Sequence, residues 1–443
     1  MKSRMKLSFW LGMIALFLLL RVPATAQDNS EGLTLKECLS TALARNPMIK
    51  EAVLGIKSAE ELVASAQGKH WPRLSLDGSY IRREQPFPYI QAQSAKIPPQ
   101  FSDVYYSLGS TLTLPIYQGG QISTGVSLAE VRRDIQVLTA GQTKNDIIAN
   151  TANTYNKILQ LQQLRKASQA SVNALKEQVK NTRLLLDLGR AARVDFLKVD
   201  VQLANERQRL LATEEALKNA SATLRYLMGE GPEAQNPLPT LRDRLVADEF
   251  KADFSSGVAV AHERRPEYLI PKKAVEEAKL NRRLAVGRLL PTANVFASDT
   301  RWHGYTLKYT DTLWIAWLTL SFPLFDRSLY ADLSRERIQT DRASERFRAA
   351  ENQLGLEVAN AITSIEESRN RISAAEKAVA QGEESFRIEQ ERYDSGAGAV
   401  VDLLLAQAAS INAVANYTQA LFDYNAALVA YRKATGTLEE YLQ

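Results

Sequence analysis

The sequence has a single cysteine, Cys38, among 443 residues, which excludes a disulfide framework and a metal site built from cysteines. Its 15 prolines and 21 glycines are too few for a collagen-like or linker-rich chain. A strong excess of one charge is also missing once the N-terminus is set aside. Residues 1–26 hold four basic residues and no acidic one, so the remainder has 51 basic and 50 acidic residues. This balance excludes a nucleic-acid-binding protein with a basic surface.

Histidine is almost as scarce, and no catalytic motif accompanies it. The pair His262-Glu263 is not followed by a second histidine at zinc-site spacing, and His70 and His303 stand alone. The sequence contains neither a phosphate-binding loop nor a nucleophile elbow. We therefore predict a protein without enzymatic activity, metal or cofactor, in which Cys38 is a buried apolar thiol.

Long apolar runs are confined to the N-terminus. Basic residues precede an apolar run at 7–20, and an Ala-x-Ala box follows at 24–26, which is the pattern of a cleaved secretory signal peptide. An uncleaved anchor is the alternative, but the run is short for a membrane span. The next most apolar stretch, 403–422, contains six polar residues. A mature chain beginning near Gln27 is expected to be soluble outside the cytoplasm or to enter a membrane as β-strands.

The second half of the chain repeats the first. Landmarks recur in the same order at a spacing of 207–219 residues, which predicts a duplicated unit with an insert near 230–255 between the copies. The landmarks are Asn46-Pro47 with Arg265-Pro266, Trp71-Pro72 with Leu290-Pro291, Leu114-Pro115 with Phe322-Pro323, Leu188-Gly189 with Ser395-Gly396, and Gly229 with Gly436.

Each copy predicts the same order of elements, which is a helix, two strands, a very long helix and a return helix. The long helix of about 68 residues would rise roughly 100 Å, so it must pack against partners along its length. The predicted ranges are 48–67, 73–83, 104–115, 121–188 and 194–228 in the first copy, and 267–287, 292–303, 311–323, 327–395 and 400–434 in the second.

The return helices carry a large side chain at nearly every seventh position, which predicts coiled-coil packing. The first helix and the return helix together are nearly long enough to cover the long helix. The heptad positions are Phe196, Leu203, Leu210, Leu217 and Leu224, and then Leu403, Ser410, Tyr417, Tyr424 and Tyr431.

The strands have the length and alternation of membrane strands, and aromatic residues such as Trp71, Tyr117 and Trp314 lie near their ends or along their faces. A soluble sheet with an aromatic core is the alternative. Four strands cannot close a membrane barrel, because open edges are not allowed in lipid and the smallest such barrels have about eight strands. Several chains must therefore pool their strands, to give about eight from two copies or about twelve from three.

An ordered set of short motifs resembles the TolC-like outer membrane efflux protein family. The resemblance covers about 33–436. The motifs are Leu33-Thr34-Leu35, Ala44-Arg45-Asn46-Pro47, Trp71-Pro72, Leu114-Pro115-Ile116-Tyr117-Gln118-Gly119-Gly120, Arg392-Tyr393-x-Ser395-Gly396, and Val401-Asp402-Leu403-Leu404-x-Ala406-Gln407.

The resemblance implies an α+β membrane protein that forms a homotrimer. Each chain would give four strands to one transmembrane β-barrel in the outer membrane lipid, and its long helices to a coiled-coil α-barrel across the periplasm. The trimer would be the exit duct of a tripartite efflux or type I secretion system. It would be joined by a periplasmic adaptor (membrane fusion protein) to an inner-membrane pump of RND, ABC or MFS type. Neither the cargo nor the pump class can be read from the sequence.

The resemblance also implies that the two helical hairpin tips bind the adaptor and form the gate. The contact residues would be Leu188, Gly189, Ala192, Val194, Ser395, Gly396, Val400 and Val401. Asp195 and Asp402 match family positions, and Asp402 would contribute to an acidic ring that favours cations.

Each aspartate has a second interpretation, because a carboxylate in the first turn of a helix stabilises the helix dipole. The sequence also departs from the family. Leu405 stands where a second acidic residue is common, and Gly398 stands where a basic residue often locks the closed mouth. Both departures argue against a strongly charged, tightly locked entrance.

The predicted organisation is a signal peptide (1–26), a first repeat (27–229), an equatorial insert (230–255), a second repeat (256–436) and a short tail (437–443). The rival hypothesis is a secreted periplasmic coiled-coil scaffold or adaptor without a pore. It explains the signal peptide and the heptads. It does not explain two strand pairs of membrane length, each leading into a long helix.

Overall fold

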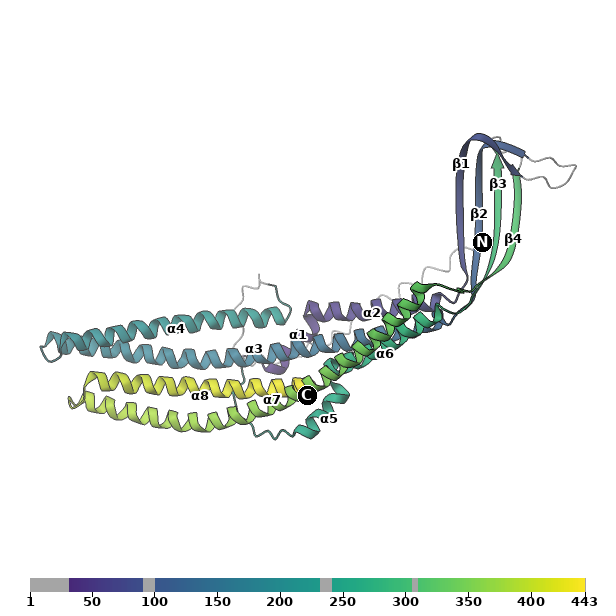
Figure 1. Ribbon diagram of the computed structural model, residues 1–443. Helices are drawn as coiled ribbons and strands as arrows, with labels where there is room; N and C mark the ends of the chain where they lie inside the picture. The colour runs from purple at the N-terminus through teal and green to yellow at the C-terminus, as the bar shows by residue number, and fades with distance from the viewer. Residues whose placement is uncertain (1–31, 91–99, 232–240, 305–309, 443) are drawn as a thin grey trace, which may run out of the picture.

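The computed structural model describes residues 32–90, 100–231, 241–304 and 310–442. The predicted signal peptide lies outside the described residues, as do residues 91–99 between the first two predicted strands and residues 232–240 of the insert predicted at 230–255. The molecule is elongated, with a four-stranded sheet at one end and two helical hairpin tips at the other (Figure 1).

The elements follow one order twice, as the duplication predicts. The first copy contains α1 (Leu35–Arg45), α2 (Pro47–Gly68), β1 (Arg73–Ile90), β2 (Gln100–Gln118), α3 (Gln121–Asp187) and α4 (Arg193–Leu227). The second contains α5 (Phe254–Arg264), α6 (Pro266–Gly287), β3 (Thr292–Gly304), β4 (Thr310–Ser321), α7 (Arg327–Asp394) and α8 (Val400–Thr435), and a short 3₁₀-helix, Leu438–Leu442, follows.

Sequence reasoning did not predict α1 and α5 as separate helices, although they are a matched pair of 11 residues each. In both copies a single residue separates the end of the short helix from a proline that starts the next helix. Proline favours the first position of a helix, whereas the residue before it avoids helical angles. Asn46 and Arg265 accordingly have extended backbone angles, so each copy bends there.

The return helices end against these bends at almost the same contact. Gly229 and Gly436 have left-handed backbone angles, with φ of 80° and 73°. A Cβ atom on Gly229 would lie 2.7 Å from the carbonyl carbon of Arg45, and one on Gly436 would lie 3.1 Å from that of Arg264. Glycine is required here by close approach of two backbones as well as by φ.

The helices form a curved layer in which the two copies lie side by side. Towards the tips the order is α4, α3, α8, α7, and towards the sheet it is α2, α3, α6, α7. The long helices α3 and α7 are thus covered along their length by a short helix and a return helix, as predicted. The heptad residues of α4 face this contact, since Leu203, Leu210 and Leu224 are buried.

The sheet has the antiparallel order β1-β2-β3-β4, so β2 of the first copy pairs with β3 of the second. Leu112 pairs with Ala297, and Leu74 and Ala316 complete that row across the four strands. β1 and β4 are edge strands in the described part of the chain. The sheet is therefore an open strip that links the two copies.

The first two strands, predicted at 73–83 and 104–115, are longer in the structure than expected. β1 continues to Ile90 and β2 begins at Gln100, with the register shifted between Arg82 and Phe87. Pro86 and Pro88 led us to expect a loop. Proline is tolerated here because the ladder is irregular between Arg82 and Phe87, where regular pairing is interrupted.

The segment 241–253 crosses the helices at mid-length, where α1, α5 and the ends of α4 and α8 meet. We call this level the waist. Leu241 and Leu245 are buried against Tyr155, Leu224 and Leu421, so the segment joins α3, α4 and α8 into one hydrophobic cluster. Cys38 lies in the same cluster and is fully buried, as predicted, and burial raises the pKa of its thiol to about 12.

Among the described helices, none contains a stretch apolar and long enough to cross a membrane.

Candidate functional site: hairpin tips and waist

The two hairpin tips are built on the same backbone motif. At the end of α3, the amide of Gly189 donates to the carbonyl of Leu186 at 2.9 Å and the amide of Arg190 donates to that of Leu185 at 2.7 Å. At the end of α7, Gly396 donates to Tyr393 at 3.0 Å and Ala397 to Arg392 at 2.8 Å. Both patterns are Schellman motifs.

The motif explains the predicted tip glycines. Gly189 and Gly396 have φ of 71° and 77°, in the left-handed region, and a Cβ atom on either would meet nothing within 4 Å. Their role is therefore conformational. Each allows the chain to leave one helix and, after the short segments 190–192 and 397–399, to enter the return helix.

Most of the predicted contact residues are exposed at the two tips. They come from two segments that are far apart in sequence but lie at the same end of the molecule (Figure 1). The exposed residues are Leu188, Gly189, Ala192, Val194, Ser395, Gly396 and Val401.

Val400 is placed differently. It is only 5% exposed and packs with Val172, Leu175 and Val199 of the first hairpin. Sequence reasoning placed it among the contact residues because it lies in the tip segment that matches the family's contact region. The structure shows that the second hairpin anchors itself on the first through this side chain, which leaves Val401 as the exposed neighbour.

The two predicted aspartates occupy matching positions in the first turns of α4 and α8. Asp195 Oδ1 lies 3.7 Å from the Nζ atom of Lys198, one turn further along α4. Asp402 is exposed and makes no ion pair or hydrogen bond with the described residues. The position that matches Lys198 is Leu405. Of the two, Asp402 is the aspartate with an unneutralised carboxylate.

The charges around the two tips have opposite signs. Residues 180–200 include five basic and three acidic side chains, whereas residues 387–407 include two basic and four acidic ones. Arg387 is paired with both Glu384 and Glu391, and Arg392 with Glu389, so the basic side chains of the second tip are neutralised locally. The first tip is therefore basic and the second acidic.

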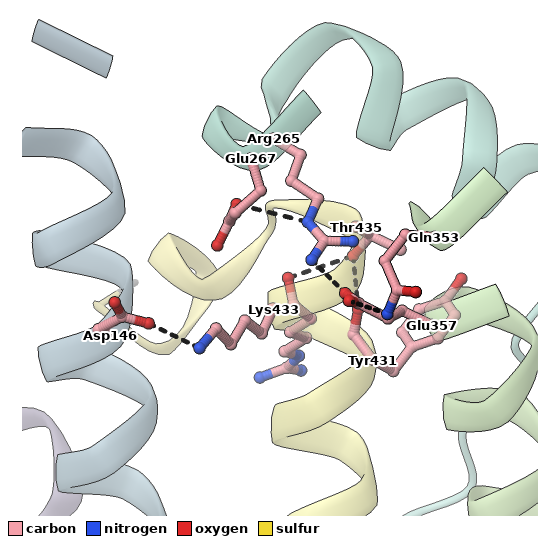
Figure 2. A network of polar contacts seen from close by, with 9 residues as sticks. Asp146, Arg265, Glu267, Gln353, Glu357, Tyr431, Lys433 and Thr435 are labelled. Atoms are coloured by element: carbon pink, nitrogen blue, oxygen red, sulfur yellow. Dashed lines mark hydrogen bonds and ion pairs between the residues drawn. The ribbon is translucent and has the colours of Figure 1, made fainter. Parts of the chain in front are cut away.

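At the waist, the structure brings together a polar network that sequence reasoning missed. Figure 2 shows Arg265, at the joint between α5 and α6, lying between Glu267 of α6 and Glu357 of α7. The Arg265 side chain is 7% exposed, and its Nε atom is 3.4 Å from Glu267. Gln353 also donates to Glu357, at 2.8 Å. Only the match of Arg265 with Asn46 in the duplication pointed to this residue.

The network perturbs the acidity of Glu357. Partial burial acts to raise the pKa of this carboxyl group, but hydrogen bonds from Gln353 and Arg265 outweigh it and hold the pKa below its usual range. Close by, Lys433 of α8 reaches Asp146 of α3 at 2.6 Å (Figure 2). The network therefore links α5 and α6 to α7, and its neighbouring ion pair links the second copy to the first.

A second polar contact fastens the crossing segment to the start of α1. The hydroxyl of Tyr155 donates to Asp243 at 2.8 Å, and the amide of Leu35 donates to the same carboxylate at 3.0 Å. Burial, the largest cause, and the adjacent Asp243 raise the pKa of Tyr155, so the phenol stays protonated. These contacts fix the segment where the helices change partners.

Comparisons with known proteins agree with this geometry. A family model described as outer membrane efflux protein matches residues 38–230 and 259–437. The outer membrane efflux protein BepC of Brucella suis is 24% identical over 418 residues, covering 91% of this chain and 86% of that protein. TolC of Salmonella enteritidis is 25% identical over 430 residues, covering 93% and 83%.

A solved structure shares the fold. The CmeC outer membrane channel of Campylobacter jejuni matches with a TM-score of 0.79 at 16% identity, covering 91% of this chain and 85% of that one. The two gaps in the family match, before residue 38 and at 231–258, fall at the N-terminus and around the segment that crosses the waist.

Proposed function

Because the chain belongs to the outer membrane efflux protein family, we propose that three copies assemble into one continuous duct. The protein is an outer membrane efflux channel with a helical tunnel in the periplasm, and it is not an enzyme. It conducts substrates passively, since the pump of the tripartite system supplies the energy. The pore-less scaffold hypothesis is not favoured, because the family is that of outer membrane efflux proteins and the structural neighbour CmeC is an outer membrane channel.

The open sheet is the observation that supports the proposal of a trimer. One chain contributes four strands with unpaired edges at β1 and β4. In lipid, unpaired backbone groups cost several kcal/mol each, so the edges must pair with other copies. Three copies would supply about twelve strands, which lies within the range of known membrane barrels.

The helical layer supports the same arrangement. Between the waist and the tips, the order α4, α3, α8, α7 leaves the outer sides of α4 and α7 without a neighbouring helix in the described chain. Repeating the strip about a threefold axis would place α7 of one copy beside α4 of the next. Exposed apolar residues of α4, such as Leu197, Val201 and Leu211, would be covered by that contact.

We assign the hairpin tips to the periplasmic adaptor, which connects the duct to an inner-membrane pump. Leu188, Val194 and Val401 would supply apolar contact, and the small residues Gly189, Ala192, Ser395 and Gly396 would let an adaptor helix approach closely. A threefold assembly would alternate basic and acidic tips around the entrance. The pump would be of the RND, ABC or MFS type, and the proposal assigns no particular cargo.

Asp402 is the residue that we propose as the selectivity element of the periplasmic mouth. Its carboxylate is exposed and unpaired, and three copies would place three such groups around the axis. Asp195 would have a weaker effect, because Lys198 lies beside it. The proposed domain organisation keeps the boundaries given above, with 230–255 as a belt around the waist and the barrel in outer membrane lipid.

A planar bilayer recording of the detergent-purified protein tests the duct. We expect discrete conductance steps from the wild type, and an oligomer mass of three chains in the same preparation. A stable monomer or dimer that carries current would contradict the trimer. An inserted trimer that stays closed, even when both tips are opened by substituting Leu188 and Val401 with aspartate, would contradict the continuous duct.

A further inference from the structure

The register of the sheet separates its two faces. One face, which we call the apolar face, includes Leu74, Leu76, Leu108, Leu112, Leu114, Val295, Leu318 and Leu320. The opposite face includes Ser75, Thr111, Thr113, Ser298, Thr300 and Thr319. Because side chains alternate along a strand, the apolar face is the one that would contact lipid in a barrel.

In the described rows, charged residues interrupt the apolar face only in the half of each strand that is further from the helices. In its described rows they are Arg82 on β1 and Asp299 and Arg301 on β3. A basic residue on the lipid side costs about 2–4 kcal/mol at the bilayer midplane but about 0–1 kcal/mol near the interface. Because Arg301 lies close to the end of β3 at Gly304 and Arg82 lies further still from the helices, we infer that this half of the sheet reaches the level of the lipid headgroups of the outer leaflet.

An aromatic pair lies between the two arginines. Tyr80 pairs with Tyr106 in the register, and their ring centroids are 5.2 Å apart. Arg82 is two residues beyond Tyr80, whereas Arg301 pairs with Leu108, two residues before Tyr106. Strand geometry puts the Cα atoms of the two arginines about 17 Å apart, four residues along the sheet and two strands across.

Both guanidinium groups are available to a ligand. Arg82 is exposed and makes no ion pair or hydrogen bond with the described residues. The Arg301 side chain is 61% exposed, and only its Nε atom approaches Asp299, at 4.0 Å. Its two terminal amino groups make no ion pair or hydrogen bond within the described part of the chain, and these are the groups that bind a phosphate in the forked, bidentate geometry.

We propose that Arg82, Arg301 and the Tyr80–Tyr106 pair bind the headgroup of a bis-phosphorylated, acylated disaccharide, the glycolipid of the outer leaflet. Each arginine takes one phosphate, and the tyrosine rings offer a flat amphipathic surface to the sugars between them. The acyl chains run down the apolar face towards Leu74 and Leu112. This proposal rests on the barrel proposed above, because only a barrel turns this face to lipid.

The spacing makes the proposal selective. A glycerophospholipid with one phosphate can engage only one of the two arginines, whereas a disaccharide with a phosphate at each end can engage both. The glycolipid should therefore bind more tightly than the phospholipid, and removal of one of its phosphates should abolish most of that advantage.

The test uses the purified full-length protein in detergent with three probes, which are bis-phosphorylated lipid A, the mono-phosphorylated form, and phosphatidylglycerol. Binding is measured by native mass spectrometry and by the thermal midpoint of oligomer dissociation. The variants are R82Q, R301Q and the double variant. The control is R83Q, which makes the same change in charge on the opposite face, where Arg83 lies beside Tyr105.

We expect each of R82Q and R301Q to weaken binding of bis-phosphorylated lipid A about tenfold or more, since a hydrogen bond to a charged group is worth at least about 1.4 kcal/mol. R83Q should bind as the wild type does. Unchanged binding in the double variant, or equal binding of phosphatidylglycerol, would overturn the proposal.

Conductance separates this outcome from failure of the duct. A preparation that forms oligomers and conducts but binds the three probes equally refutes the glycolipid site alone. A preparation that never forms oligomers refutes the barrel, and the glycolipid site with it. Should R82Q or R301Q fail to assemble, R82K and R301K provide the second variants, because lysine keeps the charge and loses the bidentate fork.

Discussion

The two hairpins share a backbone and differ in charge. Both leave the first helix through a Schellman motif and place an aspartate in the first turn of the return helix. Beyond the backbone they diverge, since Lys198 neutralises Asp195 whereas Leu405 leaves Asp402 free. Both copies keep the Schellman motif and the first-turn aspartate, so we infer that folding of the hairpin requires these features. The charged neighbours of the aspartate differ between the copies and were free to specialise.

The two bends at the waist also share a backbone feature and differ in the side chain that holds them. Asn46 and Arg265 hold equivalent bends, but Asn46 uses a neutral side chain that donates to the carbonyl of Leu227 at 2.8 Å. Arg265 instead uses a buried charge held by Glu267 and Glu357. The close approach of Gly229 and Gly436 is common to both copies, so the contact between the bend and the helix end is the conserved structural requirement of the unit.

The largest effect should come from the tighter of these two contacts. We expect Gly229→Ala to destabilise the protein by about 3 kcal/mol, because the new Cβ meets the backbone at 2.7 Å and the left-handed angle costs about 1–2 kcal/mol by itself. Gly436→Ala should cost about half as much. Urea denaturation at one protein concentration, followed by the helical circular dichroism signal, measures the free energy of unfolding of both variants. Equal losses of stability would show that the difference between the 2.7 Å and 3.1 Å contacts has no energetic effect.

Removing the charge at the second bend should be the next largest change. Arg265→Met is expected to cost about 2–3 kcal/mol, since it leaves Glu357 partly buried without its cation. Asn46→Ala should cost about 1–2 kcal/mol, through loss of one helix cap and one buried hydrogen bond. The same denaturation assay ranks the pair. A double variant, Arg265→Met with Glu357→Leu, should recover part of the loss, and no recovery would argue against an ion-pair origin.

The waist network should also make stability sensitive to acid. The pKa of Glu357 is lower in the folded protein than in the unfolded chain, so its contribution is complete above about pH 4.3 and is lost as the pH falls through the lowered folded value. The difference in stability between wild type and Glu357→Gln should therefore shrink from pH 7 to pH 3. A constant difference across this range would show that the lowered pKa of Glu357 does not contribute to the stability of the protein.

A smaller effect is expected on ion selectivity. Asp402→Asn should lower the preference for cations about threefold, since one carboxylate within about 6 Å of a passing ion contributes about 0.7 kcal/mol in water. Asp195→Asn should change it less. Leu405→Lys supplies the matched control, because it gives Asp402 the partner that Asp195 already has. Reversal potentials in a salt gradient measure all three, and an Asp195→Asn effect as large as that of Asp402→Asn would contradict the assignment.

The smallest effect concerns the helix dipole. Both aspartates stabilise the start of their helices by about 0.5 kcal/mol, whatever their role in the pore. Hydrogen exchange of the first-turn amides should therefore rise slightly and equally in Asp195→Asn and Asp402→Asn. A rise at Asp195 alone would show that the Lys198 pair, rather than the dipole, orders that turn.

Much of the architecture could be predicted from patterns that repeat locally. The bounds of α3 and α7 were expected within about one residue, because a long helix without proline ends at a glycine-containing turn. The duplication supplied the order of all the long elements. The extension of β1 to Ile90 was missed, because the irregular pairing that accommodates proline depends on the neighbouring strand β2.

The site was only partly predictable for the same reason. The tip residues and both aspartates come from short motifs and could be named from the sequence. The burial of Val400 depends on contact between hairpins more than 200 residues apart. The pairing of Arg265 with Glu357 spans 92 residues and depends on α7 lying beside the joint of α5 and α6. Nothing in the residues around Arg265 distinguishes a buried arginine from an exposed one until the fold places α7 beside it.

The open edges of the sheet also have a genetic consequence. If the β-barrel forms only when β4 of each copy pairs with β1 of the next, one misfolded copy prevents the whole trimer from forming a barrel. A cell that makes equal amounts of normal and defective chains would then assemble fully normal ducts in only about one case in eight. Alleles that damage β1 or β4, yet still allow the chains to meet, should therefore be dominant over the normal gene.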